Sequence, residues 1–537
     1  MKNTPSSQMD TLNLRTQTWF SRLSQLMYEN RYCLISALVF GFFSYMFTFT
    51  NKLVIHDDLT HMFNKGFTVS SGRWGLSLLS LVLPDVSMPW FHGVITILLI
   101  APAVCIAVRL LSIRSPLLQV LTAGLEICFP SLIGTFGYMF TSSSYGAAFL
   151  LAVLSVWCFF RLDLKGLLGG LLCCILSLSI YQAYISVTVT LLVLVLMQKT
   201  MYTDTPVRKI FRQGLEAVGF LILSLGLYWG LTWLIQRQMG VAMNGYAATA
   251  VLEDSLLSRP VNCLKMTAYI LLLGYKGLVH EGFLQVVHLI FLGIVGFELV
   301  VWCCSSRKKD RILMLVFLCA LLPFALNAVL LFTSMSSAHS LVLYGFAGIY
   351  VLAALVLDGG SRIPSRRQGL SRLRALLMDL AVICLTLVVF SNASTANRAS
   401  MNLYLRYENN YSMANSVITQ IEALPGFTAD TPVLVVGRFP VTNDYDRILD
   451  VNHITGVSEH ATRGWEPSEF MKYYCGADFE YLSLEQNQNL LMSPGFRAMP
   501  FFPDQGSIGY VDGTVVVKLD PWSLPEEFVS LIQPDQN

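Results

Sequence analysis

Residues 167–197 read LLGGLLCCILSLSIYQAYISVTVTLLVLVLM, an apolar run of 31 residues without a charged side chain. Basic residues lie at both of its ends: Arg161 and Lys165 before it, and Lys199, Arg208, Lys209 and Arg212 after it. Because short cytoplasmic loops collect Lys and Arg, a single crossing would place one of these basic loops on the wrong side of a membrane. A helix of this length would measure about 46 Å, which is enough for two short crossings. The run therefore predicts a helical hairpin with its apex at Tyr181-Gln182-Ala183-Tyr184, slightly inside the membrane.

The composition extends this interpretation to most of the chain. Of its 537 residues, 54% are hydrophobic and only 13% are charged, and the mean hydropathy is +0.57. A soluble domain carries roughly a quarter charged residues. The net charge of +2 gives no general attraction to nucleic acid. Of the 12 cysteines, 11 lie in or beside apolar blocks and none forms a CxxC pair, so neither a zinc site nor a disulfide framework is predicted.

Apolar blocks of membrane-spanning length predict 11 transmembrane helices. Besides the two halves of residues 167–197, these blocks are residues 32–50, 90–107, 117–140, 145–160, 215–235, 283–304, 312–332, 341–357 and 376–390. The loops assigned to the cytoplasm carry 17 Lys and Arg residues, whereas the longer loops assigned to the outside carry 7. This difference orients the protein with residues 1–31 as a cytoplasmic tail and with the C-terminus outside.

After residue 391 the composition changes, and charged residues, Asn, Pro and Gly return. Residues 396–424 predict a helix that Pro425-Gly426 ends, and residues 432–437 and 513–518 predict buried strands, the second after a turn at Asp512-Gly513. We therefore expect an all-α polytopic membrane domain over residues 32–391. A small extracytoplasmic α/β domain over residues 392–537 is expected to follow it.

The strongest candidate for chemistry is the sequence Val54-Ile-His-Asp-Asp-Leu59, which directly follows the first predicted transmembrane helix. Its adjacent carboxylates, Asp57 and Asp58, repel each other unless a cation or a metal ion lies nearby. Such a pair suits a general base with an orienting partner, or a metal site. A solvated loop, or a helix N-cap at Asp58, would explain the same residues.

A second candidate follows at Ser70-Ser-Gly-Arg-Trp74, where apolar sequence resumes. The guanidinium of Arg73 is always charged and offers paired donors, which suits a phosphate group. The structural alternative is an interfacial anchor made of Arg73 and Trp74. We favour the phosphate site because Asp57, Asp58 and Arg73 share one loop.

Two further groups carry suitable polar side chains. In the sequence Tyr275-Lys-Gly-Leu-Val-His-Glu281, Lys276 or His280 could contact a phosphate. For each residue taken alone, a snorkelling Lys and a solvated His-Glu pair is the better explanation. At the hairpin apex, Tyr181 and Gln182 offer ring stacking and an amide, which suit a sugar, or they belong to an interfacial aromatic belt.

Three acidic residues, Glu126, Glu298 and Asp379, fall inside predicted transmembrane helices, one on each helix. Ionisable groups at this depth are often functional. No Lys or Arg is predicted at the same depth, so we expect these three acids to be packed, hydrogen-bonded or protonated rather than part of a proton pathway.

In their order along the chain, these motifs resemble the polytopic glucosyltransferases that modify O-antigen, known as the glucosyl transferase II family, with the broader character of GT-C glycosyltransferases. The motifs that carry the resemblance are His56-Asp57-Asp58, Ser71-Gly72-Arg73-Trp74, Phe140-Thr-Ser-Ser-Ser-Tyr-Gly146, the Tyr181–Tyr184 apex, and the ending from Met499-Pro-Phe-Phe-Pro503 to Val517-Lys518. The resemblance covers nearly the whole chain. It implies transfer of a hexose, glucose in this family, from a polyprenyl-phosphate carrier to a cell-surface glycan such as the O-antigen of lipopolysaccharide. The reaction would take place at the outer face of the bacterial inner membrane.

The resemblance also implies roles for residues. An acid of the first outer loop would act as the base, either Asp57 or Asp58, and we favour Asp58. Arg73 and Lys276 would bind the donor phosphate. The remaining candidate substrate contacts are His56, Trp74, Tyr181, Gln182, His280 and Glu281. Some GT-C enzymes use a divalent metal ion and others do not; a metal here would be bound by Asp57 and Asp58.

Other classes of protein compete with this interpretation. A transporter or flippase of a lipid-linked sugar would show inverted repeats, interrupted helices in matched positions and charges at the membrane midplane. A non-enzymatic scaffold would not need acids and an Arg-Trp pair in one loop. A polysaccharide polymerase, or a transferase of another sugar, is not separated from a glucosyltransferase by the residues alone.

Overall fold

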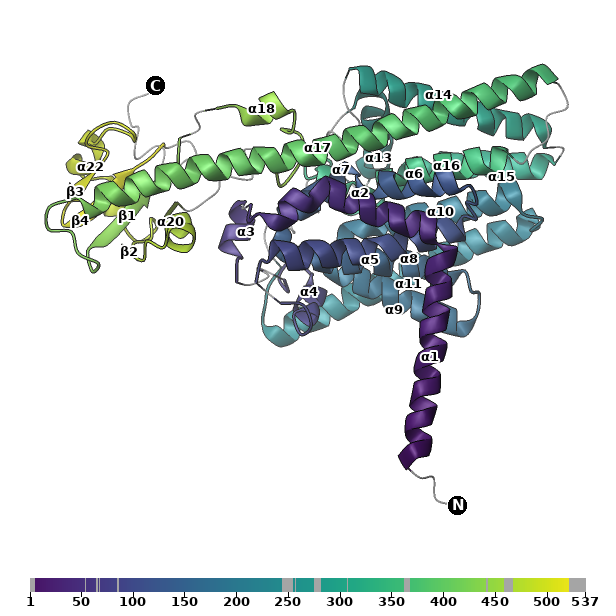
Figure 1. Cartoon of the computed structure of the whole chain (residues 1–537), viewed down its shortest axis with the longest axis horizontal. Coiled ribbons are helices and arrows are strands. Elements are labelled where there is room, and N and C mark those ends of the chain that lie inside the picture. Colours follow the sequence, from purple (N-terminus) through teal and green to yellow (C-terminus); the bar gives the residue numbers. More distant parts are fainter. Residues whose placement is uncertain are drawn as a thin grey trace.

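The computed structural model describes residues 5–53, 55–63, 66, 68–84, 86–243, 255, 257–274, 282–306, 308–361, 368–440, 443–457 and 467–520. A bundle of helices forms most of the molecule, and one long helix leads from this bundle to a small sheet (Figure 1). The helices of the bundle are α1 (Pro5–Glu29), α2 (Arg31–Thr50), α3 (His56–Thr60), α4 (Trp74–Leu79), α5 (Pro89–Leu110), α6 (Pro116–Ile127), α7 (Pro130–Gly137), α8 (Met139–Phe159), α9 (Leu164–Ile180), α10 (Ile185–Tyr202), α11 (Val207–Met239), α13 (Ser258–Leu273), α14 (Phe283–Ser305), α15 (Lys309–Leu326) and α16 (Gly348–Gly360).

The bundle has the apolar helices of a membrane protein. Within the described residues, 7 helices are long and apolar enough to cross a membrane, and the bent pair α6 and α7 would make an eighth span. The helix α9 and the segment Tyr344–Gly360 are apolar but shorter. The protein is therefore a polytopic membrane protein, and the number of 11 crossings stays a prediction.

The predicted hairpin is confirmed. Residues 167–197 divide into α9 and α10, joined by the short 3-10 helix Gln182–Tyr184 at the predicted apex. The ring of Tyr181 stacks on Tyr145, near the start of α8. At the other end of the hairpin, the Lys199 ammonium lies over the ring of Phe160, which directly follows α8. Thus α9 runs back along α8, and α10 returns to the level at which α9 began.

Two predicted spans have different boundaries. The block 117–140 is not one helix, because Pro130 starts α7 and the axis bends by 41° between α6 and α7. Proline lacks a backbone N–H and is favoured at the first position of a helix. Residues 141–144, which fall between the predicted spans 117–140 and 145–160, belong to the buried start of α8. Three of their hydroxyls are hydrogen-bonded within the protein: Thr141 donates to the carbonyl of Tyr138, Ser142 donates to the carbonyl of Met139, and Ser143 bonds to Nδ1 of His92.

One prediction about charges is wrong. The buried Glu298 of α14 does have a basic partner, because Arg374 donates to both of its carboxylate oxygens at 2.8–3.2 Å. Arg374 also donates to the carbonyl of Gly360. Sequence analysis placed Arg374 in a cytoplasmic loop, but α17 begins at Gln368 and carries it into contact with α14. A paired buried acid of this kind needs no role in proton transfer.

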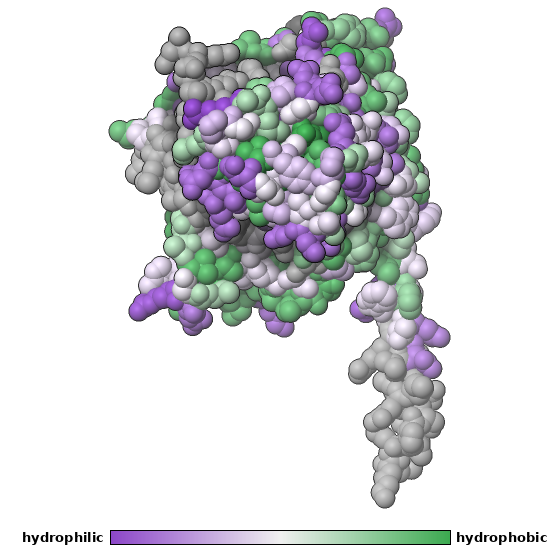
Figure 2. Space-filling view, turned by 90° about the vertical axis from the view of Figure 1, so that its left-hand side faces the viewer, coloured by the Kyte–Doolittle hydropathy of each residue, from purple (hydrophilic) through white to green (hydrophobic). Residues whose placement is uncertain are grey.

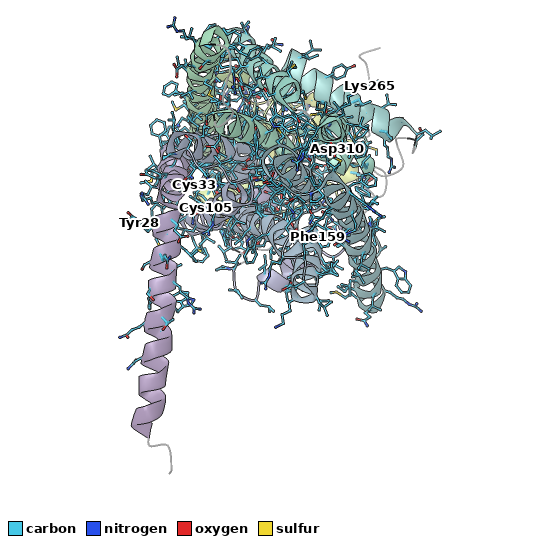
Figure 3. The ribbon with its side chains drawn as sticks, turned by 90° about the vertical axis from the view of Figure 1, so that its right-hand side faces the viewer. Tyr28, Cys33, Cys105, Phe159, Lys265 and Asp310 are labelled. Carbon is cyan, nitrogen blue, oxygen red and sulfur yellow. The ribbon has the colours of Figure 1, made fainter. Side chains whose placement is uncertain are left out.

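A single helix, α17 (Gln368–Glu422), runs from the bundle to the C-terminal domain and passes through residues 391–392, where sequence analysis placed the domain boundary (Figure 1). Helix α1 projects away from the bundle (Figure 1), and Tyr28 lies near the place where α1 meets it (Figure 3). The junction is tied by Glu29, which pairs with Arg109 at 3.2 Å.

The C-terminal domain is built on a four-stranded sheet in the order β2-β1-β4-β3. Its strands are β1 (Pro432–Val436), β2 (Glu480–Tyr481), β3 (Ile508–Val511) and β4 (Thr514–Lys518), and its helices are α18 (Tyr445–Leu449), α20 (Pro467–Cys475), α21 (Gln488–Leu491) and α22 (Pro494–Ala498). The two predicted strands are β1 and β4, which pair in parallel, and the predicted turn at Asp512-Gly513 joins β3 to β4. Figure 2 shows this end of the molecule, where hydrophilic residues gather over the domain and hydrophobic residues lie toward the margins.

Candidate active site

The acid pair lies on α3, a single helical turn that follows α2. Asp58 is fully buried, and its carboxylate accepts hydrogen bonds from Lys52 Nζ at 2.9 Å, Ser87 Oγ at 2.5 Å and the backbone N–H of Phe140 at 3.2 Å. Phe140 is in the first turn of α8, where a negative charge also interacts favourably with the helix dipole. These donors engage both oxygens of Asp58, whereas the neighbouring Asp57 is partly exposed. Of the two acids, Asp57 is therefore the more accessible to another molecule.

Arg73 lies at the start of α4, directly after Gly72. Gly72 has a φ of +74°, and a Cβ at this position would lie 2.8 Å from the hydroxyl of Tyr228, so only glycine fits here. The Arg73 guanidinium donates to the Tyr145 hydroxyl at 3.1 Å and lies 5.5 Å from the centre of the Tyr181 ring. An aromatic face and a phenol oxygen thus orient the positive charge.

The hairpin apex holds this loop in place. Gln182 Nε2 donates to the carbonyl of Ser71 at 2.9 Å and to the Tyr228 hydroxyl at 3.0 Å. Tyr228 donates in turn to the carbonyl of Gly72 at 3.0 Å, and the indole N–H of Trp74 donates to Thr232 at 3.1 Å. The structure therefore brings together four residues that sequence analysis selected separately: Arg73, Trp74, Tyr181 and Gln182.

Three of these residues, Arg73, Tyr181 and Gln182, line a chamber of about 240 Å³. Polar groups on its wall include Ser71, Arg73, Gln182, Tyr228, Thr333 and His339. The chamber adjoins a groove of about 350 Å³ between α10, α11 and α15, because Ile185, Leu225 and Phe332 line both spaces. All of the residues that line the groove are apolar. From Phe211 to Leu225 the groove follows α11 for about 21 Å at 1.5 Å per residue.

Helix α8 connects the acids to the chamber. Its second residue, Phe140, binds Asp58 through the backbone N–H, and Tyr145 binds Arg73 through the phenol oxygen. Residues 140 and 145 are separated by about 7.5 Å along a helix axis. The acid pair and the guanidinium are therefore held by neighbouring turns of one rigid element.

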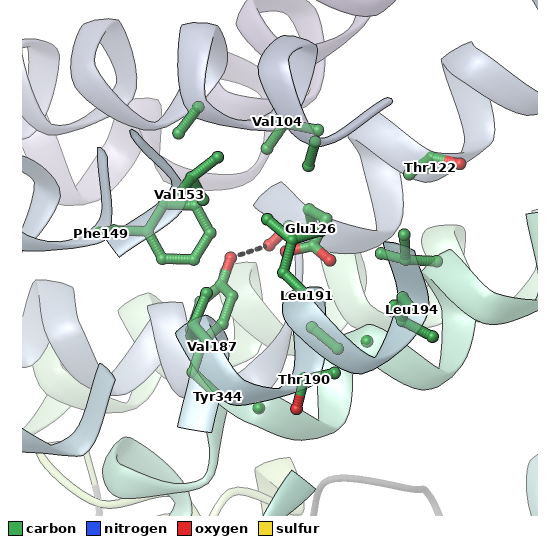
Figure 4. Close-up of a pocket in the computed structure, with 16 residues that line it drawn as sticks. Val104, Thr122, Glu126, Phe149, Val153, Val187, Thr190, Leu191, Leu194 and Tyr344 are labelled. Carbon is green, nitrogen blue, oxygen red and sulfur yellow. Dashed lines mark hydrogen bonds between the residues drawn. The ribbon is translucent and has the colours of Figure 1, made fainter. Parts of the chain in front are cut away.

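A separate small cavity of about 40 Å³ lies beside Glu126 and Tyr344, between helices of the bundle (Figure 4). The Tyr344 hydroxyl donates to the backbone carbonyl of Glu126 at 2.6 Å. Most of the side chains around this cavity are apolar, among them Phe149, Val153 and Leu191. This space is far too small for a sugar, and it is a packing feature of the bundle.

A family model for the glucosyl transferase GtrII matches residues 46–352. This range is more than half of the chain and begins within α2 and ends within α16. The chain belongs to the GtrII glucosyl transferase family. Neither the curated proteins nor the solved structures include a match to it.

Membership of the GtrII family makes the protein a membrane glycosyltransferase of the glucosyltransferase kind, with a sugar donor and a glycan acceptor. The matched range contains the acid pair, Arg73, the hairpin apex and the apolar groove. It ends before α17 and the C-terminal sheet.

The described residues do not fit a divalent metal site. No group of three or more His, Cys, Asp or Glu side chains that could hold a metal ion is found among them. One of the two predicted ligands, Asp58, already accepts from the Lys52 ammonium, which occupies the place that a cation would take. We therefore assign no step of the GtrII reaction to a metal ion.

Several predicted contacts fall outside the described part of the chain. They are Lys276, His280, Glu281 and the side chain of His56, so their roles stay predictions.

Four residues of the site were not predicted from the sequence: Lys52, Ser87, Tyr145 and Tyr228. Tyr145 belongs to the motif Phe140–Gly146, but its position in the sequence does not predict that its ring stacks on Tyr181. Tyr228 lies in an apolar helix, where a tyrosine carries no local signal of function.

Proposed function

We propose that this GtrII protein transfers glucose from a polyprenyl-phosphate carrier to a glycan such as O-antigen, at the outer face of a bacterial inner membrane. The observation that carries the proposal is that an apolar groove adjoins a chamber whose wall includes the charged Arg73 and other polar groups. A lipid-linked donor has the same two parts, because a long apolar tail is attached to a charged phosphate and a sugar.

In this proposal the groove between α10, α11 and α15 holds the polyprenyl tail. Its walls carry no polar side chain, so a hydrocarbon loses no hydrogen bonds there. The phosphate lies in the chamber beside Arg73, whose guanidinium is fixed by Tyr145 and Tyr181. Tyr181 and Gln182 then face the sugar side of the chamber. The lipid tail explains why the reaction requires a membrane protein.

The chemical step follows from the positions of the charged groups. Asp57 accepts the proton of an acceptor hydroxyl, and the hydroxyl oxygen bonds to the anomeric carbon of glucose. The bond between that carbon and the phosphate oxygen breaks, and the lipid phosphate leaves with both electrons. Arg73 stabilises the negative charge that develops on this phosphate. Asp58 stays bound to Lys52, Ser87 and Phe140 and holds α3 in place.

The distribution of Lys and Arg supports the orientation of this reaction toward the outer face. The loops that carry Asp57 and Arg73 follow the end of α2 opposite the basic N-terminal segment, and they lie on the side of the C-terminal domain. A donor flipped to the outer leaflet would reach the groove from the bilayer.

The test is transfer of radiolabelled glucose in proteoliposomes that contain the purified protein and an O-antigen acceptor. Polyprenyl-phosphate-glucose and a nucleotide-linked glucose are offered separately, to the unmodified protein and to Asp57→Asn. We expect transfer from the lipid donor alone, and a loss of about 10²–10⁴-fold in Asp57→Asn.

Two outcomes would overturn the proposal. Transfer from the nucleotide-linked sugar would contradict the lipid donor. Movement of the lipid donor across the bilayer without formation of a glycosidic bond would identify a flippase instead.

A further inference from the structure

The acid pair lies between two separate hydrophobic cores. Ile55, two residues before Asp57, is fully buried in the core of the membrane domain. Leu59, directly after Asp58, is only 1% exposed and belongs to the core of the C-terminal domain, as does Met62. Because α3 has a single turn, any movement of one core relative to the other would displace the acids.

The C-terminal side of this contact is made by α17 and α20. Helix α20 contacts α3, and the core that contains Leu59 and Met62 also contains buried side chains of both helices, namely Ala414, Val417, Ile421, Phe470 and Met471. Next to them, the ring of Phe63 lies 5.5 Å from that of Tyr473. Burial raises the pKa of the Tyr474 phenol, and the negative charge of Asp58 raises it further, which places this tyrosine close to the acid.

The C-terminal domain is also fixed to the bundle away from α3. The segment after α18 packs so closely on α7 that a Cβ on Gly137 would lie 2.3 Å from the carbonyl oxygen of Gly456. Nearby, the backbone N–H of Thr455 donates to Ser340 Oγ at 2.9 Å. A buried ion pair between Arg406 and Asp446, at 2.9 Å, ties α18 to α17, and Asn402 of α17 donates to the carbonyl of Val457 in the segment that follows α18. The domain is therefore held as a fixed support rather than a loosely tethered module.

We propose that the C-terminal domain positions the acid pair, with Leu59, Met62, Phe470 and Met471 as positioning residues. Asp58 is bound to the membrane domain through Ser87 and Phe140, while the next residue along α3 is buried in the C-terminal core. The position of Asp57 is therefore fixed by both contacts, that of Asp58 with the membrane domain and that of Leu59 with the C-terminal core. The inference rests on the proposed role of Asp57 in glucose transfer, and it gives the region beyond the family match a part in the reaction.

The chain offers a matched control for the test. Leu491, on the opposite face of the C-terminal sheet, is as buried as Leu59, with 0% of its surface exposed. Leu59→Ala and Leu491→Ala remove the same atoms, but only the first change lies at α3. Loss of kcat is expected for Leu59→Ala, by about 10- to 100-fold, because a misplacement of about 1 Å can cost this much. The KM for the lipid donor should stay unchanged, and Leu59→Met should restore kcat.

A second measurement does not depend on activity. Carbodiimide labelling of carboxylates, read by mass spectrometry on folded protein, reports whether Asp57 and Asp58 are accessible. We expect Asp58 to be protected in the unmodified protein and in Leu491→Ala, and to become labelled in Leu59→Ala. If the unmodified protein transfers no glucose, the proposed function fails, while this labelling still tests the positioning.

Two results would overturn the inference. One is equal labelling of Asp58 in all of the variants. The other is an equal loss of kcat in Leu59→Ala and Leu491→Ala, which would show that only the stability of the domain matters.

Discussion

Asp58→Asn is expected to destabilise the folded protein rather than to remove the catalytic base. The asparagine oxygen can still accept from the Phe140 N–H, but the amide N–H₂ group replaces an oxygen that accepts from Lys52 at 2.9 Å. Two donors would then face each other, and the ammonium would lose its negative partner.

The magnitude follows from the burial of the two partners. Removing one member of a fully buried ion pair costs roughly 3–5 kcal/mol. The Lys52 side chain keeps 29% of its surface exposed, so water replaces part of the lost interaction. We therefore expect a loss of about 2 kcal/mol in the free energy of unfolding, between the values of buried and exposed pairs.

The assay compares the thermal unfolding midpoints of purified variants in the same lipid nanodiscs. Asp58→Asn should lower the midpoint by several degrees. The double variant Lys52→Met/Asp58→Asn should recover part of this loss, because it removes both charges. Asp57→Asn should leave the midpoint unchanged while it lowers turnover by about 10²–10⁴-fold.

The opposite pattern would refute this reasoning. If Asp58→Asn kept the normal midpoint and lost turnover, while Asp57→Asn remained active, then Asp58 would be the base that sequence analysis favoured.

Three further changes test other parts of the structure. Arg73→Lys keeps the positive charge but removes the planar guanidinium, whose several N–H donors can bind Tyr145 and the proposed phosphate at the same time. The kcat/KM for glucose transfer should therefore fall about 10- to 100-fold. Gly214→Phe places a ring in the apolar groove and should raise the KM for the lipid donor; its Cβ causes no clash, because the nearest atom lies at 3.6 Å. Gly219→Phe, on the same helix but with open space around it, should leave this KM unchanged. Glu298→Gln should lower the unfolding midpoint strongly, because it removes the negative charge that faces the buried Arg374, at a cost of roughly 3–5 kcal/mol. Glu216→Gln, which changes an exposed pair, should have little effect.

Much of the fold was predictable because it depends on local patterns. Basic residues at both ends of one apolar run required a hairpin, and the structure has it with the break at Tyr181–Tyr184. Continuous apolar runs predicted the buried strands β1 and β4, and the turn at Asp512-Gly513 was predicted before the second of them. The bend before Pro130 and the continuous α17 were not predicted. In an apolar block a proline does not show whether a helix bends or ends. Residues 376–390 and 396–424 were predicted as two helices, and the change of composition after residue 391 hid the fact that they are one.

The site was predicted as residue types but not as an arrangement. A charged Arg73 near a phosphate was inferred from chemistry, and its contacts to Tyr145 and Tyr181 arise only when the hairpin packs on α8. The difference between Asp57 and Asp58 was also hidden, because it depends on Ser87 and Phe140, which lie 29 and 82 residues away along the chain. The burial of Leu59 in a core formed by residues beyond 400 was hidden for the same reason, because its partners are distant along the chain.

The most direct test of the central claim is to find where the lipid donor binds. A polyprenyl-phosphate-glucose analogue with a photoreactive diazirine in its tail is bound to the purified protein, activated by light, and mapped by mass spectrometry. Adducts on residues of α11 and α15 that line the groove, such as Phe211 and Phe317, are expected, and Arg73→Ala should reduce them. Adducts confined to the opposite face of α11 around Gly219, or unaffected by Arg73→Ala, would contradict the proposed donor site.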